Sequence, residues 1–263
     1  MPLELVWSFQ HESEELENLV RFQEAAPCIY HRSLMERQRS SKAFYGGSNP
    51  SGGAINITMK IAAALFGMHY NQDYDHWCFG KTKLDYRRVI KNNQQVLWSN
   101  NEFTSVDFYG STYDSPVIDQ LKQDYNFKEV LIHNFDNGPG SVVCRNRRFI
   151  EVLNLVKKNY QHYDYTVVTR FDLYFIDNPF TKNIVTDRVN VLYRAKWGDD
   201  DSICDDCFYY IPRLKFLEFV ECIANLSIDT HSHTYNQHYG DFHYMVDGCY
   251  YSHQSPIYHI NRF

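Results

Sequence analysis

Two charged side chains stand at the end of an apolar stretch in the middle of the chain. The run from Tyr165 to Thr169 has the β-branched composition of a strand buried in a mostly parallel sheet. Arg170 and Asp172 follow, two residues apart, so an extended chain points both to the same face. Because open α/β sheets bind ligands at the carboxyl ends of their strands, we interpret the pair as the floor of a polar site. The alternative is a structural ion pair that closes the edge of the sheet.

A second group of reactive side chains lies in the acidic stretch 199–207. Asp205 and Asp206 are candidate general bases, because transfer of a group to a hydroxyl requires a carboxylate or a histidine to take its proton. The alternative is a solvated acidic turn. Cys204 and Cys207 enclose the two acids with the spacing of zinc ligands. A Cys₂His₂ zinc site would need further ligands from the histidine-rich tail, which offers His231, His233, His238 and His243.

Three arginines stand near the start of the helix expected over 143–160: Arg145, Arg147 and Arg148. Positive charge at this end opposes the helix dipole, which suggests an anion nearby, and a solvated basic face is the alternative. The glycine- and proline-rich stretch 45–53 precedes another expected helix, 55–68, and helix N-termini also bind phosphate. The stretch lacks the Gly-Lys-Ser/Thr ending of a P-loop, so a connector or a lid is the alternative.

The elements that position these residues alternate in type from residue 76 onward. The pattern predicts strands at 77–80, 105–110 and 130–133, and a central strand that begins at Tyr165 and carries Arg170 and Asp172 at its end. It predicts helices between them at 85–98, 115–125 and 143–160, and then a strand at 188–193, a strand at 208–211 and a helix at 213–224. Such alternation favours right-handed crossovers and a parallel sheet. Residues 1–73 do not share it, so we expect an N-terminal extension, 1–73, packed on an α/β domain, 74–263.

Composition limits the class of protein. The 263 residues are 44% hydrophobic and 22% charged, as in ordinary soluble chains, and the formal charge of −6 argues against a nucleic-acid binder with a broad basic surface. No run of about 18 apolar residues predicts a membrane span. The N-terminus lacks the features of a signal peptide, so we expect a soluble cytoplasmic protein whose seven cysteines are reduced.

Several of these stretches resemble one family. Residues 163–175, Tyr-Asp-Tyr-Thr-Val-Val-Thr-Arg-Phe-Asp-Leu-Tyr-Phe, resemble the YDYVVxxRxDLxF stretch of nucleotide-sugar glycosyltransferases with a GT-A-like fold, found in large algal viruses (the chloroviruses), algae and bacteria. Residues 78–83 and 106–109 resemble the family's first strand, with its small-residue turn, and its second strand. Residues 205–212 resemble the strand that follows its metal region. The resemblance covers about residues 74 to 220.

The resemblance implies a fold and an activity. The fold is a GT-A-like single domain of the α/β class, with a mostly parallel, Rossmann-like sheet flanked by helices and an N-terminal extension. The activity is transfer of a sugar, with xylose expected, from a UDP-linked donor to a hydroxyl of a glycan such as an N-glycan. Catalysis would fall to Asp205 and Asp206. The implied donor-binding residues are Phe79, Gly80, Lys81, Tyr109, Arg148, Arg170 and Asp172.

The family often uses a divalent metal, Mn²⁺ or Mg²⁺, held by an Asp-x-Asp motif. Here Arg170 replaces the first aspartate, which leaves Asp172 as the expected metal ligand and puts metal dependence in doubt, because an arginine can itself neutralise a diphosphate. Two other classes stay open: a carbohydrate- or nucleotide-binding module without turnover, and a zinc-stabilised interaction domain. If the chain is viral, the expected location is the host cytoplasm.

Overall fold

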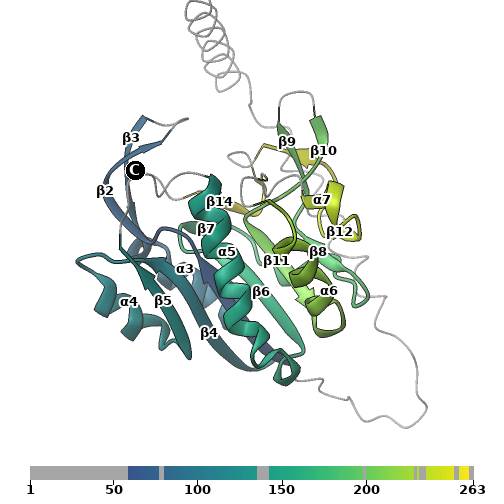
Figure 1. Ribbon diagram of the computed structural model, residues 1–263, viewed down its shortest axis with the longest axis horizontal. Coiled ribbons are helices and arrows are strands. Elements are labelled where there is room, and N and C mark those ends of the chain that lie inside the picture. The colour runs from purple at the N-terminus through teal and green to yellow at the C-terminus, as the bar shows by residue number, and fades with distance from the viewer. Residues whose placement is uncertain are drawn as a thin grey trace, which may run out of the picture. The chain divides into compact units, whose positions relative to one another are not determined.

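Strand β1 (Met59–Phe66) lies inside the main sheet, between its parallel neighbours β4 (Phe103–Tyr113) and β6 (Tyr165–Arg170), which are labelled in Figure 1. Its residues Ile61 to Leu65 are at most 1% exposed, because layers of the protein cover both faces of the strand. The computed structural model describes residues 59–76, 80–134, 142–197, 200–227, 230, 235–251 and 255–260. These residues belong to one compact unit that spans Asn56–Phe263. Most of the extension expected over 1–73, and the stretch 45–53, lie outside the described residues.

The prediction of a helix over 55–68 is wrong for its described part, because β1 is a strand. Alanine is the best helix former, and the run Ala62 to Ala64 suggested a helix. In the fold these alanines are fully buried between two layers, where tertiary packing overrides propensity. The main sheet therefore contains a strand that precedes the domain start expected at residue 74.

The main sheet has seven strands in the order β12-β8-β11-β6-β1-β4-β5. Strands β6, β1, β4 and β5 pair in parallel, β11 is antiparallel to its neighbours β6 and β8, and β12 is parallel to β8. The expected mostly parallel α/β sheet is confirmed, with β11 as its antiparallel strand. Besides β1 its strands are β4 (Phe103–Tyr113), β5 (Glu129–His133), β6 (Tyr165–Arg170), β8 (Val189–Val191), β11 (Phe208–Pro212) and β12 (Phe242–Tyr244).

Helices flank this sheet on both faces. Helices α5 and α6 pack on one face, in an apolar cluster with Ala62, Ala64 and Val168 of the sheet. Helix α4 and the helical segment that precedes β4 pack on the other, around Leu65 and Phe171. The helices predicted at 85–98, 115–125, 143–160 and 213–224 are confirmed with small shifts of their ends. The described helical segments are η2 (Tyr86–Arg88), α3 (Ile90–Asn93), the π-helix η3 (Gln94–Trp98), α4 (Ile118–Tyr125), α5 (Val142–Lys157), η4 (Tyr160–His162), α6 (Arg213–Ala224) and α7 (Tyr235–His238), of which α7 was not predicted.

The described residues also form three small sheets besides the main one. They are formed by β2 (Tyr70–His76) with β3 (Gly80–Asp85), by β9 (Arg194–Trp197) with β10 (Asp200–Cys204) and β13 (Cys249–Tyr250), and by β7 (Leu173–Phe175) with β14 (Tyr258–Ile260). A short helix η5 (Pro179–Thr181) follows β7. Two predictions change: Gly80 begins β3, outside the main sheet, and much of the expected acidic loop 199–207 is strand β10. Residues 77–79 lie outside the described residues.

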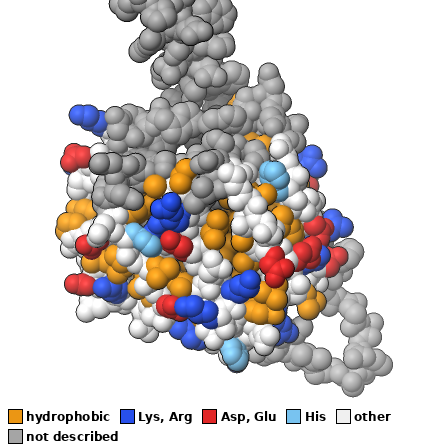
Figure 2. Space-filling model, in the orientation of Figure 1, with side chains coloured by type: hydrophobic (Ala, Val, Ile, Leu, Met, Phe, Trp, Pro, Cys, Tyr) orange, Lys and Arg blue, Asp and Glu red, His pale blue; other side chains and the backbone are white. Residues whose placement is uncertain are grey.

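The described surface mixes charges. Figure 2 shows acidic and basic side chains interspersed with hydrophobic ones on the face of the molecule in view. None of the described helices combines the length and the apolar character that crossing a bilayer would need.

Candidate functional site

The strand order of the main sheet reverses at β1. Strands β4 and β5, which follow β1 in the sequence, lie on one side of it, and every later strand of the sheet lies on the other. Ligands of open α/β sheets bind at the carboxyl ends of the strands at such a reversal. Here those ends are Phe66 of β1 and Arg170 of β6, which are direct partners in the parallel ladder. The fold thus puts Arg170 where a ligand site is expected.

Arg170 and Asp172 form a two-pronged ion pair. Nε of Arg170 donates to Oδ1 of Asp172 at 2.8 Å, and Nη2 donates to Oδ2 at 2.6 Å. The Asp172 side chain is 2% exposed and that of Arg170 is 17% exposed. The remaining nitrogen, Nη1, donates to Sγ of Cys207 at 3.7 Å. The two side chains therefore satisfy each other as an ion pair, and Arg170 also connects the pair to Cys207.

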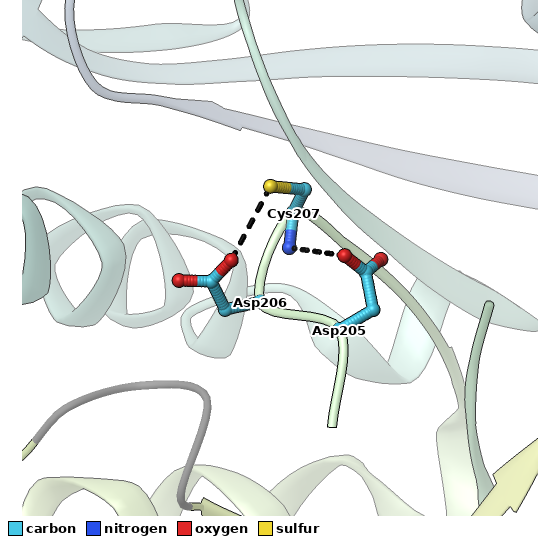
Figure 3. A group of neighbouring side chains, drawn as sticks. All are labelled: Asp205, Asp206 and Cys207. Atoms are coloured by element: carbon cyan, nitrogen blue, oxygen red, sulfur yellow. Dashed lines mark hydrogen bonds between the residues drawn. The ribbon is translucent and has the colours of Figure 1, made fainter. Parts of the chain in front are cut away.

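That next part is the turn between β10 and β11, which carries Asp205, Asp206 and Cys207 (Figure 3). The Cys207 thiol faces the Asp206 carboxylate and donates to its Oδ1 at 3.3 Å. The backbone N–H of Cys207 donates to Oδ1 of Asp205 at 3.4 Å. Three consecutive residues thus present two carboxylates and a thiol beside the Arg170 guanidinium.

Asp205 is 1% exposed and is held from the C-terminal strand β14. The hydroxyl of Tyr193 donates to the hydroxyl of Tyr258, which donates to Oδ1 of Asp205, each at 2.7 Å. Oδ2 of Asp205 makes no hydrogen bond with any described residue. Burial, and next the charge of Asp206, raise the pKa of Asp205 to about 7.

Helix α5 brings two arginines to this edge of the sheet. Nη1 of Arg145 pairs with Oδ2 of Asp206 at 2.6 Å, and its Nε and Nη2 are buried without a hydrogen-bond partner among the described residues. The Arg148 side chain, 5% exposed, lies over the Tyr113 ring at 5.2 Å and has Nη1 3.3 Å from Oε2 of Glu151. Its Nε and Nη1 also make no hydrogen bond within the described part of the chain.

A metal ion fits the side chains of the turn between β10 and β11 better than it fits Asp172. Ligand atoms of Asp205, Asp206 and Cys207 lie within 4.8 Å of one another, so the group could hold a metal ion. Asp172, the expected metal ligand, is outside this group, and both of its oxygens accept from Arg170. We therefore find that Asp172 does not fit the expected Mn²⁺ or Mg²⁺ ion.

The zinc interpretation of Cys204 and Cys207 is also not supported by their placement. Both cysteines are buried, but Cys204 packs in the apolar cluster beneath α5 and α6, whereas Cys207 packs in the cluster on the opposite face of the sheet. Of the four histidines proposed to complete the site, His231 and His233 lie outside the described residues. His238 is exposed, and Nε2 of His243 donates to the carbonyl oxygen of Asn183 at 2.9 Å.

The fold brings together some of the predicted site residues and leaves others apart. Arg170, Asp172, Asp205 and Asp206 are linked by contacts, and Arg148 lies one turn beyond Arg145 on α5. Four others lie elsewhere or outside the described residues. Tyr109 is fully buried with its hydroxyl 2.8 Å from that of Tyr163, Gly80 and the exposed Lys81 are in β3, and Phe79 lies outside the described residues.

Four members of the cluster were not among the site residues predicted from the sequence. Arg145 was noted only as part of a basic helix start, and its approach to Asp206 crosses 61 residues of sequence. Cys207 was read as a partner of Cys204. Tyr193 and Tyr258 carried no signal, because their contact spans 65 residues and Tyr258 belongs to a tail without periodicity.

Two comparisons with known proteins identified no relative of this chain. No protein-family model matches the chain, and a search of curated protein sequences finds no match.

Proposed function

We propose that the protein is a glycosyltransferase that uses a nucleotide-diphosphate sugar as donor. The observation that carries the proposal is the gathering of three guanidinium groups, from Arg145, Arg148 and Arg170, with buried carboxylates at the carboxyl edge of the sheet. This edge lies at the reversal of strand order, where nucleotide ligands of α/β sheets bind.

The charges suit the chemistry of the leaving group. Transfer of a sugar breaks its bond to a diphosphate, and the developing negative charge requires fixed positive charge nearby. Arg145 and Arg148 have buried N–H groups that make no hydrogen bond among the described residues. Buried donors of this kind are costly unless a ligand or water satisfies them, and phosphate oxygens are good acceptors for a guanidinium. Arg170 contributes less free charge, because Asp172 already neutralises it.

The finer features of the proposal come from the resemblance of residues 163–175 and their neighbours to the GT-A-like family. They are a GT-A-like arrangement of the sheet, UDP as the nucleotide, xylose as the sugar and a glycan hydroxyl as acceptor. No step is assigned to Mn²⁺ or Mg²⁺ on Asp172, because Arg170 occupies that carboxylate.

A general base is needed if the transfer inverts the configuration at the sugar. The sequence predicts Asp205 or Asp206 for this role, and both lie in the cluster. Unchanged turnover in Asp206→Asn would remove Asp206 from the role.

The test is donor hydrolysis. The full chain is incubated with a panel of UDP- and GDP-sugars, and released nucleotide is measured. We expect release from at least one donor, a large loss of release in Arg148→Met, and little change in Arg147→Met, since Arg147 is exposed on the same helix. Stabilisation by a nucleotide without release from any donor would instead favour a binding module, because a ligand at 100 times its Kd stabilises by about 2.7 kcal/mol.

A further inference from the structure

The turn between β10 and β11 has a feature that the proposed function does not use. One oxygen of Asp205 is anchored and the other is not: Oδ1 accepts from the Tyr258 hydroxyl at 2.7 Å and from the Cys207 amide at 3.4 Å, whereas Oδ2 has no hydrogen-bond partner among the described residues. The side chain is 1% exposed, so solvent does not replace that partner. A buried carboxylate oxygen in this state lacks a proton, a donor or a cation.

The charges around Asp205 favour a cation. Among the described residues, Arg145 forms an ion pair with Asp206, and Arg170 is paired with Asp172. When Asp205 is ionised, its buried negative charge has no ion-pair partner of its own among the described residues, which is costly. If Cys207 joins as a thiolate, its proton passing to solvent, the three anionic ligands are balanced by a divalent ion together with Arg145.

We propose that Asp205, Asp206 and Cys207 bind a divalent transition-metal ion, for which zinc has the best-matched ligand preference. A thiolate beside two carboxylates favours zinc over Mg²⁺ or Mn²⁺, which prefer oxygen ligands alone. The ligand atoms lie within 4.8 Å of one another, close to the span of two bonds of about 2.0–2.3 Å with an ion between them. Three protein ligands leave a fourth position open, as in catalytic zinc sites.

Tyr258 and Tyr193 have a positioning role in this site. Their hydroxyls form a chain that ends on Oδ1 of Asp205, and both side chains are fully buried. Such outer partners fix the orientation of a ligating carboxylate, and their loss usually costs 10- to 100-fold in metal affinity. The C-terminal strand β14 thereby becomes part of the metal site, although Tyr258 is 53 residues from Asp205 in the sequence.

The inference bears on the proposed function without depending on it. An ion at this turn would sit beside the guanidiniums of Arg145 and Arg170, and an open position could accept an oxygen of a donor diphosphate. That last point rests on the proposed function. Ligation and proton abstraction compete for the Asp205 carboxylate, so metal binding decides between a ligand and a general base at this residue.

The experiment measures metal binding by the purified full chain. Metal is removed with a chelator, and Co²⁺, a spectroscopic substitute for zinc, is titrated back while the near-ultraviolet charge-transfer band of a cobalt–thiolate bond is recorded. We expect one ion per chain and the thiolate band in the wild type. We expect loss of the band in Cys207→Ser, retention in Cys204→Ser, and an affinity about 10- to 100-fold lower in Tyr258→Phe.

Three results would overturn the inference: no cobalt binding by the wild type, a thiolate band that persists in Cys207→Ser, or equal loss in Cys204→Ser. Circular dichroism checks that each variant folds. If Cys207→Ser does not fold, Asp205→Asn takes its place and must weaken cobalt binding at least about tenfold, the loss typical of a perturbed metal site. Cobalt binding through Cys207 without nucleotide release from any donor would support the metal site and contradict the glycosyltransferase proposal, so the two can fail separately.

Discussion

The buried His69, in the connection between β1 and β2, makes the free energy of unfolding depend on pH in a window that follows from its contacts. His69 is 1% exposed, with Nδ1 2.6 Å from Oγ1 of Thr112 and Nε2 2.8 Å from Oγ of Ser115. Because the Thr112 hydroxyl donates to the carbonyl oxygen of Gly67, Thr112 accepts from Nδ1–H, and Nε2 accepts from the Ser115 hydroxyl. This arrangement requires a neutral imidazole.

The cost of protonating His69 gives the size of the effect. Burial lowers its pKa from 6.5 to about 4, against the opposing charges of Asp85 and Asp114. Between these values the unfolded chain binds a proton that the folded chain excludes, so stability falls as the pH falls through the window. The contribution is complete above about pH 6.5 and lost by about pH 4. Because one pH unit corresponds to about 1.4 kcal/mol, the loss attributable to His69 is roughly 3 kcal/mol.

The assay compares urea unfolding of the wild type and His69→Gln at pH values from 4 to 7. Other groups titrate in both proteins, so the difference between the two curves isolates His69. We expect the wild type to lose roughly 3 kcal/mol more than the variant between pH 7 and pH 4, whereas His238→Gln, which removes an exposed histidine, should follow the wild type. A difference that stays constant with pH would refute the neutral buried imidazole, because His69 would then ionise alike in both states.

Three further predictions concern the sheet and its edge. Ala64→Leu should cost about 1–3 kcal/mol in urea unfolding by overpacking the buried face under α5, whereas Lys60→Leu, exposed on the same strand, should cost little. Asp172→Ala should cost about 3–5 kcal/mol, because Arg170 would keep a buried charge without its partner, and it should also abolish nucleotide release if the pair serves the donor. Asn92→Ala should cost about 1–3 kcal/mol, because the Asn92 amide donates to and accepts from the backbone of β7 at 2.8 and 2.7 Å.

The elements that the sequence predicted well are those whose local pattern and tertiary environment agree. Helix α6 begins and ends at the predicted residues, 213 and 224, since its apolar stripe has one face to bury. Strand β6 was predicted from its β-branched residues, which suit a strand buried on both faces. The prediction for β1 was wrong because its alanines favour a helix locally. Small residues suit a strand here because layers of the protein pack on both of its faces.

The contacts of the candidate site also fall into those that the local sequence predicts and those that it does not. The contact between Arg170 and Asp172 follows from their spacing of two residues where β6 ends, so it was among the alternatives that the sequence offered. The pairing of Arg145 with Asp206 and the support of Asp205 by Tyr258 join distant segments, and they depend on how α5 and β14 pack against the sheet. A single sequence carries no local signal for such contacts. The presence of polar side chains at this edge could therefore be predicted, whereas the hydrogen bonds and ion pairs that join them could not.

These hydrogen bonds and ion pairs decide which residues of the site are available to bind a ligand. Arg170 and Asp172 satisfy each other with two hydrogen bonds, so a diphosphate or a metal at that pair would have to displace one of them. The turn that carries Asp205, Asp206 and Cys207 differs, because Oδ2 of Asp205 is buried without a hydrogen-bond partner in the described part of the chain. Binding there removes a cost that the folded chain otherwise bears. The sequence predicted a polar site around Arg170 and Asp172. We therefore expect the ligand to bind beside this pair, at the turn between β10 and β11.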